Sequence, residues 1–166
     1  MTANQESTGA GTGTAGESAV VDGTTLTIVR IFDAPRELLF RAWTDPDQLA
    51  RWWGPEGLHT PRETIEVEPA VGGVWKATMV MDDGGAEFPS AGHFTRIEEP
   101  GLLELHEPPS EMFDFASTLL ITLEDLGGRT RMTVVQTMHT DSFDFGDSIP
   151  GWSTSLEKLR RLADLG

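Results

Sequence analysis

The last part of the chain carries one long apolar stripe of helical period, and it follows a run of strand-like sequence that contains no helix. The apolar positions recur at i, i+3, i+7, i+10 and i+14; they are Ile149, Trp152, Leu156, Leu159 and Ala163. This spacing puts them on one face of a long helix, which we expect Ser148 to cap and Gly166 to follow. A helix with a single apolar face needs a partner surface, and the preceding sequence supplies a sheet.

Between residues 62 and 138 apolar and polar side chains alternate, and turns rich in Gly, Pro or Asp separate the runs. This pattern predicts strands at residues 62–68, 73–81, 91–99, 102–107, 115–124 and 129–138. In the second run Trp75, Ala77 and Met79 share one face of the strand. An antiparallel sheet of this size curls, and we expect the terminal helix to fill its concave side.

The chain before these strands reads as one strand followed by two short helices. Residues 25–32 are β-branched and apolar, which favours a strand. Asp33 and Pro35 then open one helix, and Asp45 can cap a second that begins at Pro46. The sequence therefore predicts an α+β fold, in which a curved antiparallel sheet of six or seven strands wraps around a long C-terminal helix.

The first residues have a different composition from the rest. Residues 1–22 are rich in Gly, Ala, Thr and Ser and contain no aromatic side chain. Such a segment buries too little apolar area to offset its loss of conformational entropy. We expect residues 1–24 to form a disordered tail and residues 25–166 to form the single folded domain.

The charge distribution bears on the partners of the protein. The net charge is −15, and residues 82–125 carry eleven acids against the single base Arg96. Such a surface repels phosphate backbones and anionic lipids, so we expect neither nucleic acid nor membrane insertion. The acidic strands 82–125 are instead a possible docking surface for a basic protein.

The remaining composition narrows the chemistry. The chain has no cysteine, which excludes disulfides and thiolate metal sites and is compatible with the cytoplasm. Its four histidines, His59, His93, His106 and His139, form none of the short spacings that bind metals. We therefore expect no metal and no cofactor. Of the four, His93 is expected to approach the interior, where it would serve as a base or hydrogen-bond donor.

Several segments together resemble one known family. The run FDAPRELLFRAWTDPDQLARWWGP (residues 32–55), the segments 72–75 and 92–94, and Gly151-Trp152 in the last helix resemble the activator of heat-shock-protein-90 ATPase-like family. This family belongs to the START-like, or Bet v 1-like, superfamily. The resemblance covers nearly all of residues 25–165 and implies a helix-grip fold. It also implies an apolar ligand between the sheet and the terminal helix, and some superfamily members are cyclases or other enzymes.

The aromatic and methionine side chains that face the expected concave side are the candidate lining of such a cavity. Together with the polar Gln136 and His93, the candidates are Trp53, Trp75, Ala77, Met79, Phe88, His93, Met132, Val134, Gln136, Trp152 and Leu156. A mostly apolar pocket with few polar groups is typical of a small-molecule site.

Three functions remain open from the sequence. The first is binding of a small apolar or aromatic ligand without catalysis, by a monomer or homodimer. The second is a cyclase- or hydrolase-type enzyme that uses the same cavity, with no catalytic residue identified. The third is a protein-interaction or stress-related co-chaperone-like module.

Overall fold

The computed structural model describes residues 16–165, which form an α+β fold with one sheet and three α-helices. The strands are β1 (Ser18–Asp22), β2 (Thr25–Phe32), β3 (Leu58–His59), β4 (Glu66–Val67), β5 (Val74–Met81), β6 (Glu87–Glu98), β7 (Leu102–Glu107), β8 (Ser117–Asp125) and β9 (Thr130–Met138). The helices are α1 (Arg36–Thr44), α2 (Pro46–Trp52) and α3 (Ser148–Leu165).

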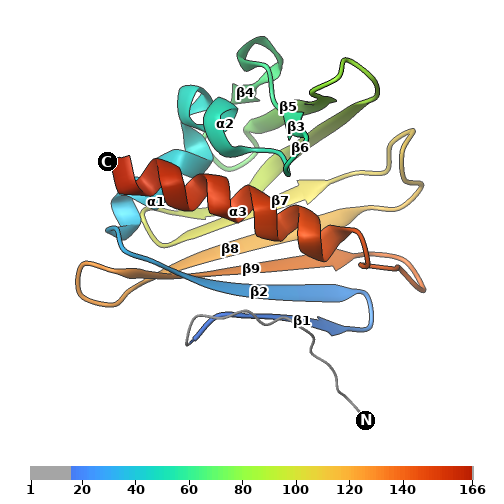
Figure 1. Ribbon diagram of the computed structural model, residues 1–166. Helices are drawn as coiled ribbons and strands as arrows, with labels where there is room; N and C mark the ends of the chain where they lie inside the picture. Colours follow the sequence, from blue (N-terminus) through green and yellow to red (C-terminus); the bar gives the residue numbers. More distant parts are fainter. Residues whose placement is uncertain (1–15, 166) are drawn as a thin grey trace.

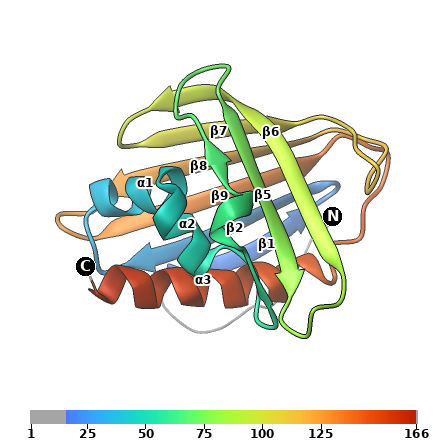
Figure 2. The same cartoon turned by 90° about the horizontal axis from the view of Figure 1, so that it is seen from above.

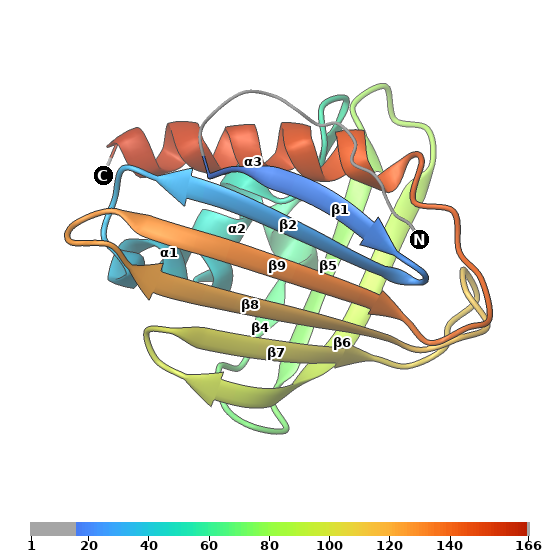
Figure 3. The ribbon, with the colours of Figure 1, turned by 90° about the horizontal axis from the view of Figure 1, so that it is seen from below.

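The sheet is antiparallel throughout and strongly curved. Its strand order is β1-β2-β9-β8-β7-β6-β5-β3, and β4 pairs with β5 away from this path. Figure 1 shows α3 lying across the sheet, and Figure 3 shows β1, β2, β9, β8 and β7 side by side. Seen from above, β5 and β6 cross steeply over the direction of β8 and β9 (Figure 2). This curvature creates the concave face that α3 covers, which confirms the predicted helix-grip fold.

The helices begin and pack as their sequences indicate. In α3 the buried residues are Trp152, Ser155, Leu156, Leu159 and Ala163, so the predicted stripe is the face turned to the sheet. The Asp45 side chain caps α2 by accepting a hydrogen bond from the backbone N–H of Asp47 at 2.9 Å. No helix within residues 16–165 has the length and apolar character needed to cross a bilayer.

The prediction that residues 1–24 form a disordered tail is wrong for residues 18–22. Residues 18–22 form β1, which pairs with β2 from Ser18↔Val29 to Asp22↔Thr25. This edge strand buries only the Ala19 side chain, and its other side chains are exposed or nearly so, which is why composition gave no signal for it. Residues 1–15 of the expected tail lie outside the described part of the chain.

A partly buried ion pair holds the segment before β1 against the end of α3. The Glu17 carboxylate accepts hydrogen bonds from the Arg160 guanidinium at 2.8 Å and from the backbone N–H of Ile31 at 3.0 Å. Arg160 also donates to the Ile31 carbonyl at 3.0 Å and lies over the Phe32 ring at 5.3 Å. The guanidinium thus joins β2, α3 and the segment before β1.

The strands differ from the prediction in three further places. Residues 62–68 do not form one strand, because a 3-10 turn over Arg62–Thr64 interrupts them after Pro61 and leaves only β4 paired. The Thr64 hydroxyl closes that turn on the Pro61 carbonyl at 2.8 Å. Strand β6 begins at Glu87 rather than at residue 91, and β3 was not expected. The sheet therefore has nine strands rather than six or seven.

Candidate functional site

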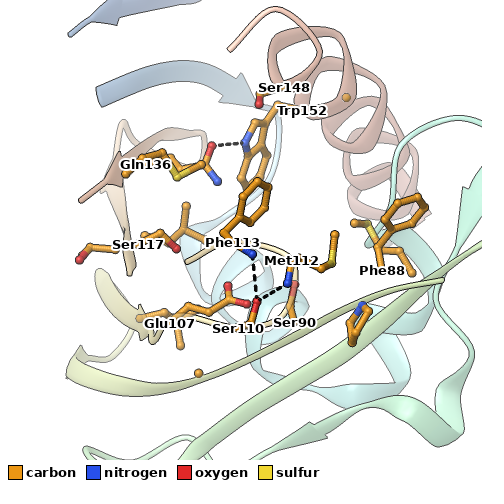
Figure 4. Close-up of a pocket in the computed structure, with 18 of the residues that line it drawn as sticks. Phe88, Ser90, Glu107, Ser110, Met112, Phe113, Ser117, Gln136, Ser148 and Trp152 are labelled. Carbon is orange, nitrogen blue, oxygen red and sulfur yellow. Dashed lines mark hydrogen bonds between the residues drawn. The ribbon is translucent and has the colours of Figure 1, made fainter. Parts of the chain in front are cut away.

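A cavity of about 350 Å³ lies between the concave face of the sheet and the N-terminal half of α3. Strands β5 to β9, the segment after α2, and the loops on either side of β8 and β9 all contribute to its wall. Most of the exposed lining is apolar. Figure 4 shows Trp152 descending from α3 toward the centre, with Gln136 on one side and Phe88 on the other.

One end of the cavity is built by the tryptophans of the chain. All five pack in one cluster, with ring centroids of Trp53 at 5.0 Å from Trp75, 5.7 Å from Trp152 and 5.6 Å from Trp43. Trp43 and Trp52 are fully buried, while Trp53, Trp75 and Trp152 line the cavity. A hydrogen bond fixes the Trp52 ring within the cluster, because Trp52 Nε1 donates to the Ala42 carbonyl at 2.8 Å.

The segment after α2 is fixed to α3, which positions Trp53 and Pro55 at the wall. The Lys158 ammonium donates to the carbonyls of Pro55 at 3.3 Å and Leu58 at 2.9 Å. The backbone N–H of Glu56 donates to the Thr154 hydroxyl at 2.9 Å. Burial lowers the pKa of Lys158 from its ordinary value, in keeping with a cation that is partly withdrawn from water.

The other end is formed by phenylalanines from two loops. Phe113 and Phe115, in the loop between β7 and β8, contact Phe143, in the loop between β9 and α3, at centroid distances of 5.9 Å. Phe143 rests in turn on the buried Phe145 at 4.9 Å. Phe113 is 45% exposed. These loop aromatics therefore lie where the cavity meets solvent.

The polar groups that reach the cavity come from the strands, from α3 and from the loops before β8 and α3. Gln136 accepts a hydrogen bond from Trp152 Nε1 at 3.2 Å, which ties the sheet to α3 across the wall (Figure 4). The Ser110 hydroxyl accepts from the backbone N–H groups of Met112 at 3.1 Å and Phe113 at 3.4 Å, which shapes the loop. Trp53 Nε1 is a buried donor with no acceptor among residues 16–165.

Two acidic residues line the cavity, Glu107 and Asp147, and Glu107 is the one on the sheet. It follows Leu103 and Leu105 with the alternation of β7, so its side chain shares their concave face, and it pairs across the sheet with Ser117. One carboxylate oxygen accepts from the Ala91 N–H at 3.3 Å. Burial raises the pKa of Glu107 above its ordinary value, and the Ala91 N–H acts in the opposite direction.

A glycine allows the strands to close around this carboxylate. A Cβ at Gly92 would lie 2.6 Å from the His106 carbonyl oxygen, closer than real contacts allow. Gly92 is also opposite Trp75 in the β5–β6 pairing and is part of the cavity wall. The close approach of β6 to β7 at this point therefore requires glycine.

The family comparison agrees with this architecture. Residues 33–164 match the family described as Activator of Hsp90 ATPase homolog 1-like protein. The chain belongs to this family. No curated protein matches the chain.

Solved structures show the same fold over most of the chain. A protein from Chromobacterium violaceum is 25% identical with a TM-score of 0.77, and the match covers 84% of this chain and 96% of that one. A protein from Arthrobacter aurescens is 27% identical with a TM-score of 0.76, covering 90% and 92%. An AHSA1 protein from Silicibacter pomeroyi is 25% identical with a TM-score of 0.67, covering 85% and 98%.

Membership in the Activator of Hsp90 ATPase homolog 1-like family supports, in general terms, a ligand-binding or co-chaperone-like module. The fold is compatible with binding either a small molecule or a protein. Among residues 16–165 no three His, Cys, Asp or Glu side chains are grouped so that they could hold a metal ion.

The structure brings six of the eleven candidate residues together in the wall of the cavity. They are Trp53, Trp75, Met79, Phe88, Gln136 and Trp152. Four others lie in the filled core beside it: Ala77, Met132, Val134 and Leu156, each at most 1% exposed. The expectation that His93 approaches the interior is wrong, because its side chain is exposed on β6 and its ring lies 5.5 Å from that of His106.

The residues that the sequence reasoning missed are mainly Glu107 and the aromatic loops. Glu107 continues the alternation of Leu103 and Leu105, so strand parity alone could have placed it on the concave face. Met112, Phe113 and Phe143 lie in irregular segments, where no periodicity assigns a face. Their signal was compositional: large apolar side chains in loops that are otherwise polar.

Proposed function

We propose that this protein binds a small apolar or aromatic molecule in the cavity between the sheet and α3. The observation that carries the proposal is a cavity of about 350 Å³, with mostly apolar lining, that the packed fold leaves unfilled. Small-molecule sites typically range from about 300 to 1,000 Å³ and combine apolar walls with a few placed polar groups. The volume suits a ligand of one or two rings.

The tryptophan cluster adds a second, independent argument. A buried N–H group without an acceptor costs free energy, and the indole N–H of Trp53 is such a group beside the cavity. Trp53 is itself part of the wall. The nitrogen itself is closed off from water, so a ligand hydroxyl or carbonyl oxygen would supply the acceptor only after the Trp53 ring turns toward the cavity.

The test uses a neutral aromatic probe, 2-(2-naphthyl)ethanol, titrated into the full chain by isothermal calorimetry. A matched pair of variants locates the binding. Ser117→Phe places a ring on the concave face of β8, between Glu107 and Met138, and Thr122→Phe places the same ring on the opposite face of the same strand. Strand alternation makes Thr122 the control for the added bulk.

Wild type and Thr122→Phe should bind the probe with the same affinity, and Ser117→Phe should lose at least tenfold, about 1.4 kcal/mol. Thermal unfolding of the variants without probe shows that each is folded. Equal binding by both variants, or no binding by folded wild type together with an unchanged melting midpoint at saturating probe, would reject the proposal.

We further propose that the protein works in the cytoplasm as a monomer or homodimer and does not bind nucleic acid. The absence of cysteine supports the compartment, and the net charge of −15 supports the exclusion of polyanions. Docking of a basic protein on the acidic strands of residues 82–125 remains the alternative for the exterior surface.

A further inference from the structure

The charges in the cavity wall narrow the chemistry of the ligand. We propose that the cavity selects molecules in which an apolar or aromatic body carries a protonated amine, and that the Glu107 carboxylate is the acceptor for that amine. This inference rests on the proposed function, and it adds a sign of charge and a named contact.

The first argument is the position of the carboxylate. Glu107 lies at the end of β7 on the same face as Leu105. It pairs across the sheet with Ser117 on β8, and Ser117 pairs in turn with Met138 on β9. The side chain extends in Figure 4 toward Ser110, at the edge of the space below Trp152. Its single hydrogen-bond donor among residues 16–165 is the Ala91 N–H, on one oxygen, and it has no ion-pair partner there. The carboxylate therefore keeps acceptor capacity that a ligand can use.

The second argument is the charge balance of the whole wall. Of the lining residues in the described part of the chain, Glu107 and Asp147 are acidic, His106 is titratable, and none is lysine or arginine. A carboxylate ligand such as a fatty acid would bring a third negative charge into this space without a cation to receive it. An ammonium group would instead form a charge-assisted hydrogen bond with Glu107.

The third argument is the free energy already stored at Glu107. A partly buried carboxylate without a cation is unfavourable, as the raised pKa of Glu107 indicates. An incoming ammonium group neutralises that charge, whereas a hydroxyl can only donate a hydrogen bond to it. The gain for an amine over a neutral analogue comes from this neutralisation as well as from the new hydrogen bond.

The experiment compares three ligands of one shape: 2-(2-naphthyl)ethylamine, 2-(2-naphthyl)ethanol and 2-naphthylacetic acid. Each is titrated into the full chain by isothermal calorimetry at neutral pH and low salt. The expected order of affinity is amine, then alcohol, then acid, with at least tenfold between amine and alcohol. A failure of all three to bind overturns the proposed function itself. Binding in which the alcohol or the acid equals the amine overturns only the amine selectivity.

A matched pair of variants assigns the selectivity to one residue. Glu107→Gln keeps the side-chain shape and the acceptor for Ala91 but removes the charge from the cavity. Glu104→Gln removes the same charge from the other face of the same strand. Glu107→Gln should bind the alcohol as tightly as wild type does, and its affinity for the amine should fall to that same value. The second should keep the wild-type preference, and an equal loss in both variants would mean a general surface field and would overturn the contact.

The dependence on pH gives an independent check. Amine affinity in wild type should fall as the pH drops through the pKa of Glu107, because the protonated carboxyl no longer attracts the ammonium group. Four other titratable groups lie nearby. They are His106, His93 on β6, whose ring contacts that of His106, Asp147 just before α3, and His139, which is hydrogen-bonded to the Thr118 hydroxyl at 2.7 Å. The pH dependence of amine affinity that remains in the Glu107→Gln variant measures the combined effect of these four groups. A pH profile identical in wild type and Glu107→Gln would contradict the assignment.

Discussion

Replacing Gly92 with alanine tests the close approach of β6 to β7 that shapes the cavity wall. The added Cβ would lie 2.6 Å from the His106 carbonyl oxygen, 3.2 Å from the His106 carbonyl carbon and 3.4 Å from the Glu107 Cα. All three atoms belong to the backbone, so a strand must move by several tenths of an ångström rather than a side chain rotate. Overpacking of this kind costs roughly 1–3 kcal/mol. The lower backbone entropy of an unfolded chain with alanine returns about 0.4–1 kcal/mol.

The net expectation for Gly92→Ala is a loss of about 1–2 kcal/mol, measured as the free energy of unfolding in urea. The control is Gly151→Ala in α3, where the new Cβ would meet only Pro55 side-chain atoms at 3.8 and 3.9 Å, ordinary contact distances. Because glycine within a helix costs up to about 1 kcal/mol relative to alanine, the control should be neutral or stabilising. If Gly92→Ala is as stable as wild type, the β6–β7 approach is looser than described, and the position of Glu107 is wrong with it.

Two further predictions concern the edge of the sheet and the buried acid. Deletion of residues 1–22 should lower the melting midpoint by more than about 2–4 °C, the shift expected for 1 kcal/mol, because it removes β1 and the Glu17–Arg160 pair. Deletion of residues 1–15 keeps β1 and Glu17 and serves as the reference truncation, and equal midpoints for the two truncations would contradict the anchoring role of β1. Since burial raises the folded-state pKa of Glu107, the native state holds that proton more tightly than the unfolded chain, so its ionisation costs stability as pH rises. Glu107→Gln should therefore be more stable than wild type at neutral pH and equal to it near pH 4, which is about the ordinary pKa of a carboxyl group. The free energy of unfolding in urea is measured for both proteins at both pH values. A variant that is less stable than wild type at neutral pH would refute the prediction.

The parts of the fold that follow a strict period were predictable from sequence. The stripe of α3 and the alternation in β5, β7, β8 and β9 each assign a face without tertiary information, and the structure buries most of the assigned residues. Edge strand β1 was missed because backbone pairing and one ion pair stabilise it, and neither leaves an apolar pattern. The 3-10 turn after Pro61 was missed because a short β-rich run does not reveal where its hydrogen bonds close.

The division between cavity and core was harder to predict, because facing the concave side is not the same as lining a void. Ala77 and Trp75 share a face of β5, yet Ala77 is 1% exposed within the packed core and only Trp75 reaches the cavity. Which positions lie against empty space depends on how far α3 and the aromatic loops extend over the sheet. That distance is set by contacts such as Lys158 with Pro55 and Phe115 with Phe143, which join segments far apart in sequence.

The indole N–H resonances of the five tryptophans provide the most direct measurement of the central claim, that the cavity binds a small aromatic ligand. In a two-dimensional nitrogen–proton NMR titration with 2-(2-naphthyl)ethanol, Trp53, Trp75 and Trp152 should shift, because they line the cavity. Trp52, which is buried and donates to the Ala42 carbonyl, should stay in place. Five unmoved indole signals at saturating probe, or shifts confined to backbone signals of exposed residues, would contradict the account.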